Sequence, residues 1–140
     1  MDMRQSDLRQ GVSEPRWIAA AAASGGISVI AGAFAAHGLD PQAEAASIGW
    51  LHTGSLYAAL HALAMLATCA LARLGQLDGR WGTVALWLFL TGSILFPGAL
   101  YGLALHGPRW LGAVAPVGGT AFILGWAALA GAALRRGTQS

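Results

Sequence analysis

The stretch HTGSLYAALHALAMLATCALAR, residues 52–73, decides the fold class of this chain. It holds no Asp, Glu or Lys, its one Arg is its last residue, and its length suits the roughly 20 helical residues that cross a bilayer core. Such a continuous apolar segment is helical, because lipid satisfies no backbone polar group. The stretch also places His61 where an ionisable group is costly. It therefore predicts a transmembrane helix with one unusual side chain.

The rest of the composition extends this prediction to the whole chain. Of the 140 residues 56% are hydrophobic and 10% are charged, against about a quarter charged in a soluble domain. Three further segments have the length of a span: residues 17–36, 83–105 and 110–134. We expect an all-α integral membrane protein, a four-transmembrane-helix bundle over residues 17–134, between polar cytoplasmic tails at 1–16 and 135–140.

The arginines predict the orientation. The chain has eight Lys and Arg residues, all of them Arg, and cytoplasmic loops carry the excess of positive charge. Seven lie on one side of the predicted spans: Arg4, Arg9, Arg16, Arg73, Arg80, Arg135 and Arg136. Only Arg109 lies on the other. Both termini are therefore expected in the cytoplasm, and because topology explains the basic residues, nucleic acid is not an expected partner.

The boundaries of the spans carry further signals. The first segment is longer than the 7–15 residues usual in the apolar part of a signal peptide, so it is expected to remain as a helix. Asp40 followed by Pro41 resembles a helix N-cap with proline at the first position, which predicts a short outer helix over residues 41–51. Four tryptophans near predicted span ends suit an interfacial aromatic belt: Trp17, Trp50, Trp81 and Trp110.

Small residues at four-residue spacing predict close helix packing. The first span has a complete ridge: Ala20, Ser24, Ser28, Gly32 and Ala36. The other spans have shorter ones: Gly54, Ala58 and Ala62; Gly98 and Gly102; Ala121 and Gly125. These ridges predict a tight bundle, with homodimerisation through a surplus ridge as the alternative.

Each span also places one polar or helix-disrupting residue nine positions from its predicted outer end: Ser28, His61, Pro97 and Thr120. Nine residues rise roughly 13 Å, close to the middle of a core about 30 Å thick. Proline cannot donate to the residue four earlier, so Pro97 frees the Ser93 carbonyl. That carbonyl and the hydroxyls of Ser28, Ser93 and Thr120 are candidate partners for His61, and Tyr57 lies one turn away. Tyr57, His61, Ser28, Ser93 and Thr120 form the candidate polar layer, structural or functional.

Catalytic, metal and cofactor roles have little support in the residues. A proton relay needs further titratable groups at depth, and two-histidine haem ligation needs a second histidine facing His61. His37, His52 and His106 lie at the outer ends of three different spans, which is no recognised ligand motif. The lone cysteine, Cys69, forms no Cys/His cluster. We therefore assign no catalytic residue, metal or cofactor.

Four strings resemble a known family: GAFAAHGL (32–39), TGSLYAALHALA (53–64), LFPGALYGLAL (95–105) and RWLGAVAPVGGTAFILGW (109–126). They are similar, in the same order, to the small bacterial membrane proteins catalogued as domain of unknown function 423, or YgdD-like, a family that extends to a small eukaryotic transmembrane protein. The matching residues are Gly32, His37 and Gly38; Tyr57 and His61; Gly98 and Tyr101; and Pro116, Gly118, Gly119, Gly125 and Trp126.

The chain departs from the family patterns at four positions. Ala35 stands where glycine is frequent, and Pro97 and Ala99 stand where serines are usual, so the freed carbonyl is a local variation. His52 often corresponds to Glu or Gln, which argues against an outer metal site. With Tyr101 added from the third motif, His37, His52 and His106 remain the outer-face candidates.

The resemblance implies a multi-pass protein of the bacterial inner membrane, for which the family supplies no catalytic residue. The leading hypothesis is a non-enzymatic accessory or assembly component that acts through helix packing, with the lipid bilayer, other membrane proteins or a second copy as partners. The alternative is a small carrier or channel-like protein with a polar layer around His61. A haem- or quinone-associated subunit is the third hypothesis.

Overall fold

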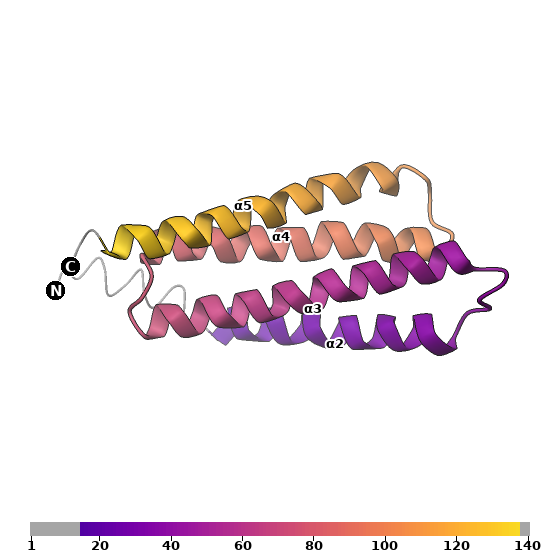
Figure 1. Cartoon of the computed structure of the whole chain (residues 1–140), viewed down its shortest axis with the longest axis horizontal. Coiled ribbons are helices and arrows are strands. Elements are labelled where there is room, and N and C mark those ends of the chain that lie inside the picture. Colours follow the sequence, from indigo (N-terminus) through magenta and orange to yellow (C-terminus); the bar gives the residue numbers. More distant parts are fainter. Residues whose placement is uncertain (1–14, 138–140) are drawn as a thin grey trace.

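A computed structural model describes residues 15–137, which form four long helices (Figure 1). They are α2 (Pro15–His37), α3 (Ala45–Arg73), α4 (Gly79–Ala104) and α5 (Leu111–Gly137). All four are long and apolar enough to cross a membrane. Even α2, with 23 residues, extends about 34 Å at 1.5 Å per residue, which exceeds a hydrocarbon core of about 30 Å. The predicted fold class, an all-α protein with four membrane spans, is confirmed.

The start of the second span differs from the prediction. α3 begins at Ala45 and continues without interruption to Arg73, so the separate outer helix expected over residues 41–51 is wrong. Asp40 instead forms a turn, in which its Oδ1 accepts a hydrogen bond from the Gln42 N–H at 2.9 Å. Asp side chains favour such turns as readily as helix caps, and residues 41–43 form a turn.

The loop between α3 and α4 is tied to the last helix. Gly75, at φ 72°, ends α3 in the left-handed conformation that glycine adopts without strain, and the Asp78 carboxylate caps α4 by accepting from the Trp81 N–H at 3.1 Å. The Asp78 N–H donates to the Ala132 carbonyl at 2.9 Å. Arg136 Nε donates to the Gly75 carbonyl at 2.8 Å. These two bonds join a turn in mid-sequence to α5.

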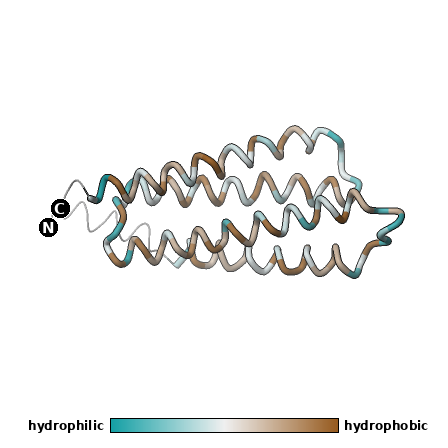
Figure 2. The backbone as a smooth tube through the Cα atoms, in the orientation of Figure 1, coloured by the Kyte–Doolittle hydropathy of each residue, from teal (hydrophilic) through white to brown (hydrophobic). Residues whose placement is uncertain are grey.

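The helices pack mainly in chain order. α2 lies against α3, α3 against α4 and α4 against α5, whereas α2 and α4 meet over a short stretch. α3 and α5 come close at few backbone positions, so side chains connect them. Hydrophobic colour runs along the helices, and much of the hydrophilic colour lies at the loops (Figure 2). The ends of α3 and α5 and the start of α4 share one end of the bundle (Figure 1).

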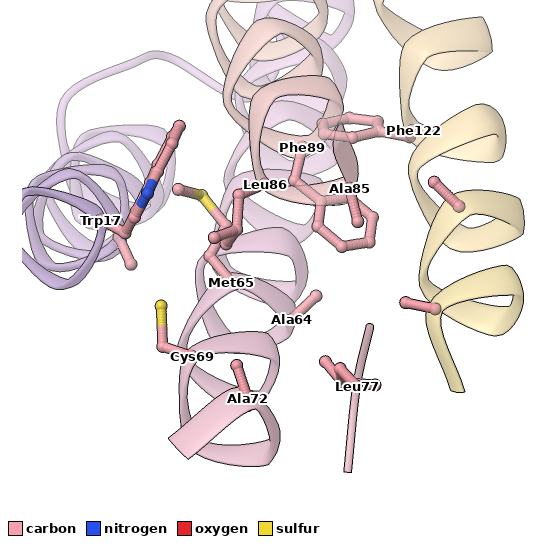
Figure 3. Packing of buried hydrophobic residues seen from close by; sticks show 13 residues of the cluster. Trp17, Ala64, Met65, Cys69, Ala72, Leu77, Ala85, Leu86, Phe89 and Phe122 are labelled. Atoms are coloured by element: carbon pink, nitrogen blue, oxygen red, sulfur yellow. The ribbon is translucent and has the colours of Figure 1, made fainter. Parts of the chain in front are cut away.

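Large side chains fill the core between the helices. Trp17, Met65, Leu86 and Phe89 are almost wholly buried in one cluster, and Figure 3 shows them between α2, α3, α4 and α5 with Phe122. The burial of Trp17 differs from the interfacial exposure expected for it. Only 2% of its surface is exposed, and its ring packs edge-to-face with that of Trp87, with 5.0 Å between the ring centroids. The position of Trp17 near the end of a span therefore did not predict that its side chain is buried.

The small-residue ridges of the first two spans face each other. Ser24 Oγ lies 3.5 Å from the Ala58 carbonyl of α3, and a Cβ added to Gly32 would meet the Ser55 side chain at 3.6 Å. In contrast, Gly98 faces open space, because no atom of residues 15–137 lies within 4 Å of an added Cβ. Of the predicted ridge of Gly98 and Gly102, Gly98 therefore does not pack within the bundle, whereas a Cβ added to Gly102 would meet the Leu111 side chain of α5 at 2.5 Å.

Candidate functional site

His61 lies at the centre of the best-defined polar contact inside the bundle. It is on α3 with only 4% of its surface exposed. Its Nδ1 lies 2.8 Å from the Tyr57 carbonyl one turn earlier, and Nε1 of Trp126, on α5, donates to its Nε2 at 3.2 Å. Both ring nitrogens therefore have partners that belong to the protein.

These two partners determine the protonation of His61. An indole N–H only donates and a carbonyl oxygen only accepts. Nε2 must therefore accept and carry no proton, and Nδ1 must carry the proton that it donates to Tyr57. The imidazole is neutral in the Nδ1–H form, the state that costs least within a bilayer. His61 joins α3 to α5 without an ionic charge.

Aromatic rings surround this hydrogen bond on three helices. The Phe122 ring of α5 stacks on His61 at 3.4 Å between centroids and 10° between planes. The ring of Phe89, from α4, packs against both His61 and Trp126, with distances between ring centroids of 5.6 Å and 5.3 Å. Tyr57 and Phe96 extend the group, with 4.9 Å between their ring centroids. We call these six residues the aromatic cluster: Tyr57, His61, Phe89, Phe96, Phe122 and Trp126.

Three glycines make room for the aromatic cluster. A Cβ at Gly92 would overlap the Phe122 ring at 2.5 Å, and one at Gly125 would overlap the Phe89 ring at 2.7 Å. At Gly118 it would strike the backbone of Phe96, where no side-chain rotation gives relief. The close approach of α5 to α4 therefore depends on glycine at these positions, which is what small residues do in membrane helices.

The other members of the predicted polar layer do not meet His61. The hydroxyl of Ser28 donates to the Gly25 carbonyl at 2.7 Å on its own helix, and that of Thr120 donates to the Pro116 carbonyl at 2.9 Å. The Ser93 hydroxyl is buried without a hydrogen-bond partner among residues 15–137. Only Tyr57, through its carbonyl and ring, shares the His61 site. The expected bonds from Ser28, Ser93 and Thr120 to His61 are therefore wrong.

Trp126 is the partner that the sequence analysis missed. Its position was a usable signal, because Trp126 lies well inside the last predicted span and not at an end. A tryptophan N–H at that depth needs an acceptor, and a neutral histidine supplies one.

The outer-face candidates do not converge. His37 is the last residue of α2, His52 is exposed on α3, and His106 follows α4 at a φ of 60°. Over residues 15–137 no group of three or more His, Cys, Asp and Glu side chains is placed to hold a metal. Tyr101 lies further inside, with its ring over Gly54 of α3 and its hydroxyl buried.

A groove opens beside the aromatic cluster, between α3 and α5. It has a volume of about 790 Å³ and is lined chiefly by apolar side chains. His61, Phe96 and Phe122 form its more buried wall, and exposed Leu60 and Ile123 stand at its rim. The volume is in the range of small-molecule sites, about 300–1,000 Å³. The groove exists because α3 and α5 are joined by side chains and not by close backbone packing.

Comparison with known proteins identifies the family. A family described as "Protein of unknown function (DUF423)" matches residues 31–119, which include α3, α4 and the start of α5. The chain belongs to this family. The matched range contains most of the aromatic cluster, including His61 and Phe96.

Relatives of this DUF423 protein are known from several bacteria. It is 43% identical over 116 residues to "UPF0382 inner membrane protein YgdD" of Escherichia coli, covering 82% of this chain and 86% of the relative. It is 38% identical to a "UPF0382 membrane protein" of Haemophilus influenzae, over 82% and 90%, and 38% identical to YwdK of Bacillus subtilis, over 78% and 88%. No solved structure matches the chain. Together with its four spans, this kinship identifies a multi-pass inner-membrane protein.

Proposed function

We propose that this DUF423 protein is a non-enzymatic accessory component of the inner membrane that binds a lipid hydrocarbon chain in the groove between α3 and α5. The observation that carries the proposal is the groove itself, about 790 Å³ in volume with a wall of stacked aromatic rings. Its rim is made of exposed leucine and isoleucine side chains on two membrane helices. A molecule in the bilayer therefore has direct access to it.

The length of the groove favours a lipid chain over a transmembrane helix. The lining runs from Leu56 to Ala67 on α3 and from Pro116 to Trp126 on α5, about 15–17 Å at 1.5 Å per residue. That is about half of the hydrocarbon core, the depth of one leaflet. A partner helix, about 10 Å wide and 30 Å long, would contact only the rim over most of its course. A single flexible chain fits both dimensions.

The hydrogen bonds of His61 support ligand binding by this groove and argue against a catalytic role for the imidazole. The groove contains one ionisable imidazole, and both of its nitrogens already bond to Tyr57 and Trp126. A general base or a metal ligand needs a free nitrogen that faces its target. The site therefore offers a shaped apolar surface, with the histidine holding two of its walls together.

Photocrosslinking tests the proposal. Full-length protein is reconstituted in vesicles that contain a phospholipid with a photoreactive acyl chain, and labelled positions are mapped by mass spectrometry. We expect labelling to concentrate on the groove lining of α3 and α5. Parallel vesicles with a photoreactive isoprenoid lipid distinguish an acyl chain from an isoprenoid as the preferred occupant.

A matched pair of variants controls this experiment. Ala67 lines the groove and is exposed, so Ala67→Phe places a ring in it. Ala130 is also exposed and lies on α5 outside the groove, so Ala130→Phe adds the same ring elsewhere. Ala67→Phe should remove the concentrated labelling and Ala130→Phe should leave it. Uniform labelling of all lipid-facing positions with either lipid would contradict the proposal.

A further inference from the structure

We propose that a pocket at the end of the bundle where α3 and α5 terminate binds the phosphate of an anionic phospholipid headgroup through Arg136. The pocket has a volume of about 320 Å³ and lies between the turn after α3 and the end of α5. Its lining residues are Gly75, Gln76, Ala133, Arg136 and Gly137. None of them lines the groove beside His61, so the inference is independent of the proposed function.

Arg136 is held in this pocket by a hydrogen bond. It is half-buried, whereas the other arginines of residues 15–137 are exposed. Its Nε donates to the Gly75 carbonyl at 2.8 Å, which uses one of the five N–H donors of a guanidinium. The other four, on the two terminal nitrogens, lie outside this bond and form the planar fork that binds phosphate oxygens in pairs. Because the side chain is already fixed, it loses less conformational entropy when an anion binds.

The charges around the pocket favour an anion. Within residues 15–137, no carboxylate lines the pocket, and Asp78 accepts from the Trp81 N–H to cap α4. α2 and α4 begin at this end and α3 and α5 terminate there, so the partial charges of the helix ends largely cancel. The arginines therefore determine the sign of the local potential. Those described at this end are Arg16, Arg73, Arg80, Arg135 and Arg136.

The surroundings of the pocket favour a lipid over a soluble anion. The Trp81 ring lies under the Arg135 guanidinium at 4.9 Å, and tryptophan concentrates at the level of the lipid headgroups. Leu74 and Leu134 neighbour lining residues in sequence and are 72% and 74% exposed, more than any other large hydrophobic side chain of residues 15–137. A phospholipid would place its phosphate at Arg136 and its acyl chains against these leucines. Basic pockets between membrane helices bind anionic headgroups in this way.

Competition between two lipids tests the inference. Full-length protein in detergent micelles is mixed with equal amounts of phosphatidylglycerol and phosphatidylcholine that carry the same acyl chains, and native mass spectrometry measures how much of each is bound. We expect a preference of about fivefold for phosphatidylglycerol, because the choline ammonium of the neutral lipid meets the same arginines. The acyl chains are identical, so binding in the groove beside His61 does not produce a preference.

Two variants that each lower the net charge by one form a matched pair. Gln76→Glu places a carboxylate in the pocket without removing the bond between Arg136 and Gly75. Arg80→Gln removes an exposed arginine at the same end that does not line the pocket. Gln76→Glu should abolish the preference, as should Arg136→Gln. Arg80→Gln should leave it within about twofold of the wild type, because salt screens exposed charges.

The ratio of bound lipids does not depend on how much of a variant is folded, since both lipids compete for the same protein molecules. Equal losses in Gln76→Glu and Arg80→Gln would overturn the inference, because they would indicate diffuse attraction to the whole end of the bundle. A wild-type protein without a preference would overturn it as well. Millimolar inorganic phosphate should leave phosphatidylglycerol bound, and displacement of the lipid would show instead a site for free anions.

Discussion

At the scale of single residues, His61 shows how a membrane helix holds an ionisable side chain. Burying an imidazole in lipid costs free energy. Two hydrogen-bond partners, the Tyr57 carbonyl and the Trp126 indole, offset this cost together with the stacked Phe122 ring. The hydrogen bonds hold the ring neutral, and the stacking holds it flat against α5. The residue therefore acts as a cross-brace between two helices that make few close backbone approaches.

His61→Leu should destabilise the bundle, because it removes this brace and leaves the Trp126 N–H without its acceptor. We expect a loss of about 1–3 kcal/mol in the free energy of unfolding, measured by denaturation in mixed micelles. Trp126→Phe should have a smaller effect, and the coupling between the two substitutions should be roughly 0.6–1.7 kcal/mol, the range of hydrogen bonds between membrane helices. Strictly additive effects would show that the His61–Trp126 bond contributes nothing.

At the scale of helices, the pairing of α4 with α5 depends on glycine. Gly118 lies against the backbone of Phe96, and Gly92 and Gly125 receive phenyl rings. The ridges of α2 and α3 meet through smaller side chains. Small residues thus serve two purposes in the α4–α5 pair: Gly118 allows close backbone approach, and Gly92 and Gly125 leave room for aromatic rings.

Gly118→Ala should therefore weaken the α4–α5 contact. The new methyl group would overlap the Phe96 backbone, so the helices must move apart, at a cost of about 1–3 kcal/mol in unfolding free energy. Gly98→Ala is the matched control on α4, because its methyl group would meet no atom of residues 15–137 within 4 Å. It should be neutral or stabilising by up to about 1 kcal/mol, since alanine favours helix. Equal losses in both variants would contradict this account.

The cap of α4 gives a second prediction at this scale. Asp78→Ala removes the side chain that accepts from the Trp81 N–H, and should reduce stability by about 1 kcal/mol. Asp78→Asn keeps an acceptor oxygen and should restore most of that loss. If the asparagine variant were as unstable as the alanine variant, charge and not capping would be the cause.

The sequence predicted the helices better than their contacts. Hydropathy identified all four spans, because lipid constrains every residue of a span in the same way. The capping pattern did not predict the structure over residues 41–51, because Asp40 suits a turn as well as a cap. Position near a span end did not predict the burial of Trp17, because that burial depends on packing against Trp87. For His61 the location was predicted and the partner was not. That partner, Trp126, is 65 residues away in sequence, and its proximity depends on the rotation of α5 about its axis.

At the scale of the whole molecule, the described arginines gather at two ends of the bundle. Arg73, Arg80 and Arg136 lie at the end where α3 meets α4 and α5 terminates, and Arg109 lies in the loop at the other end. This arrangement fits the orientation expected from the sequence. The direction in which the protein is inserted remains our prediction.

Cysteine labelling tests that orientation. In a Cys69→Ala background, Gln42→Cys reports on the loop between α2 and α3, and Gln76→Cys reports on the loop between α3 and α4; both positions are exposed. A membrane-impermeant maleimide should label Gln42→Cys in intact spheroplasts and Gln76→Cys only after permeabilisation. The reverse pattern would show that the termini face outward.

The packing of neighbours in chain order also bears on how the protein is made. Each helix that leaves the insertion machinery finds its predecessor already in the bilayer, because α3 packs on α2, α4 on α3 and α5 on α4. Assembly needs no rearrangement of earlier helices. Only the final steps are long-range: α5 must present Trp126 to His61 and bring Arg136 to Gly75. α5 therefore completes the four-helix bundle, and a chain without it would lack both the His61–Trp126 hydrogen bond and one wall of the groove.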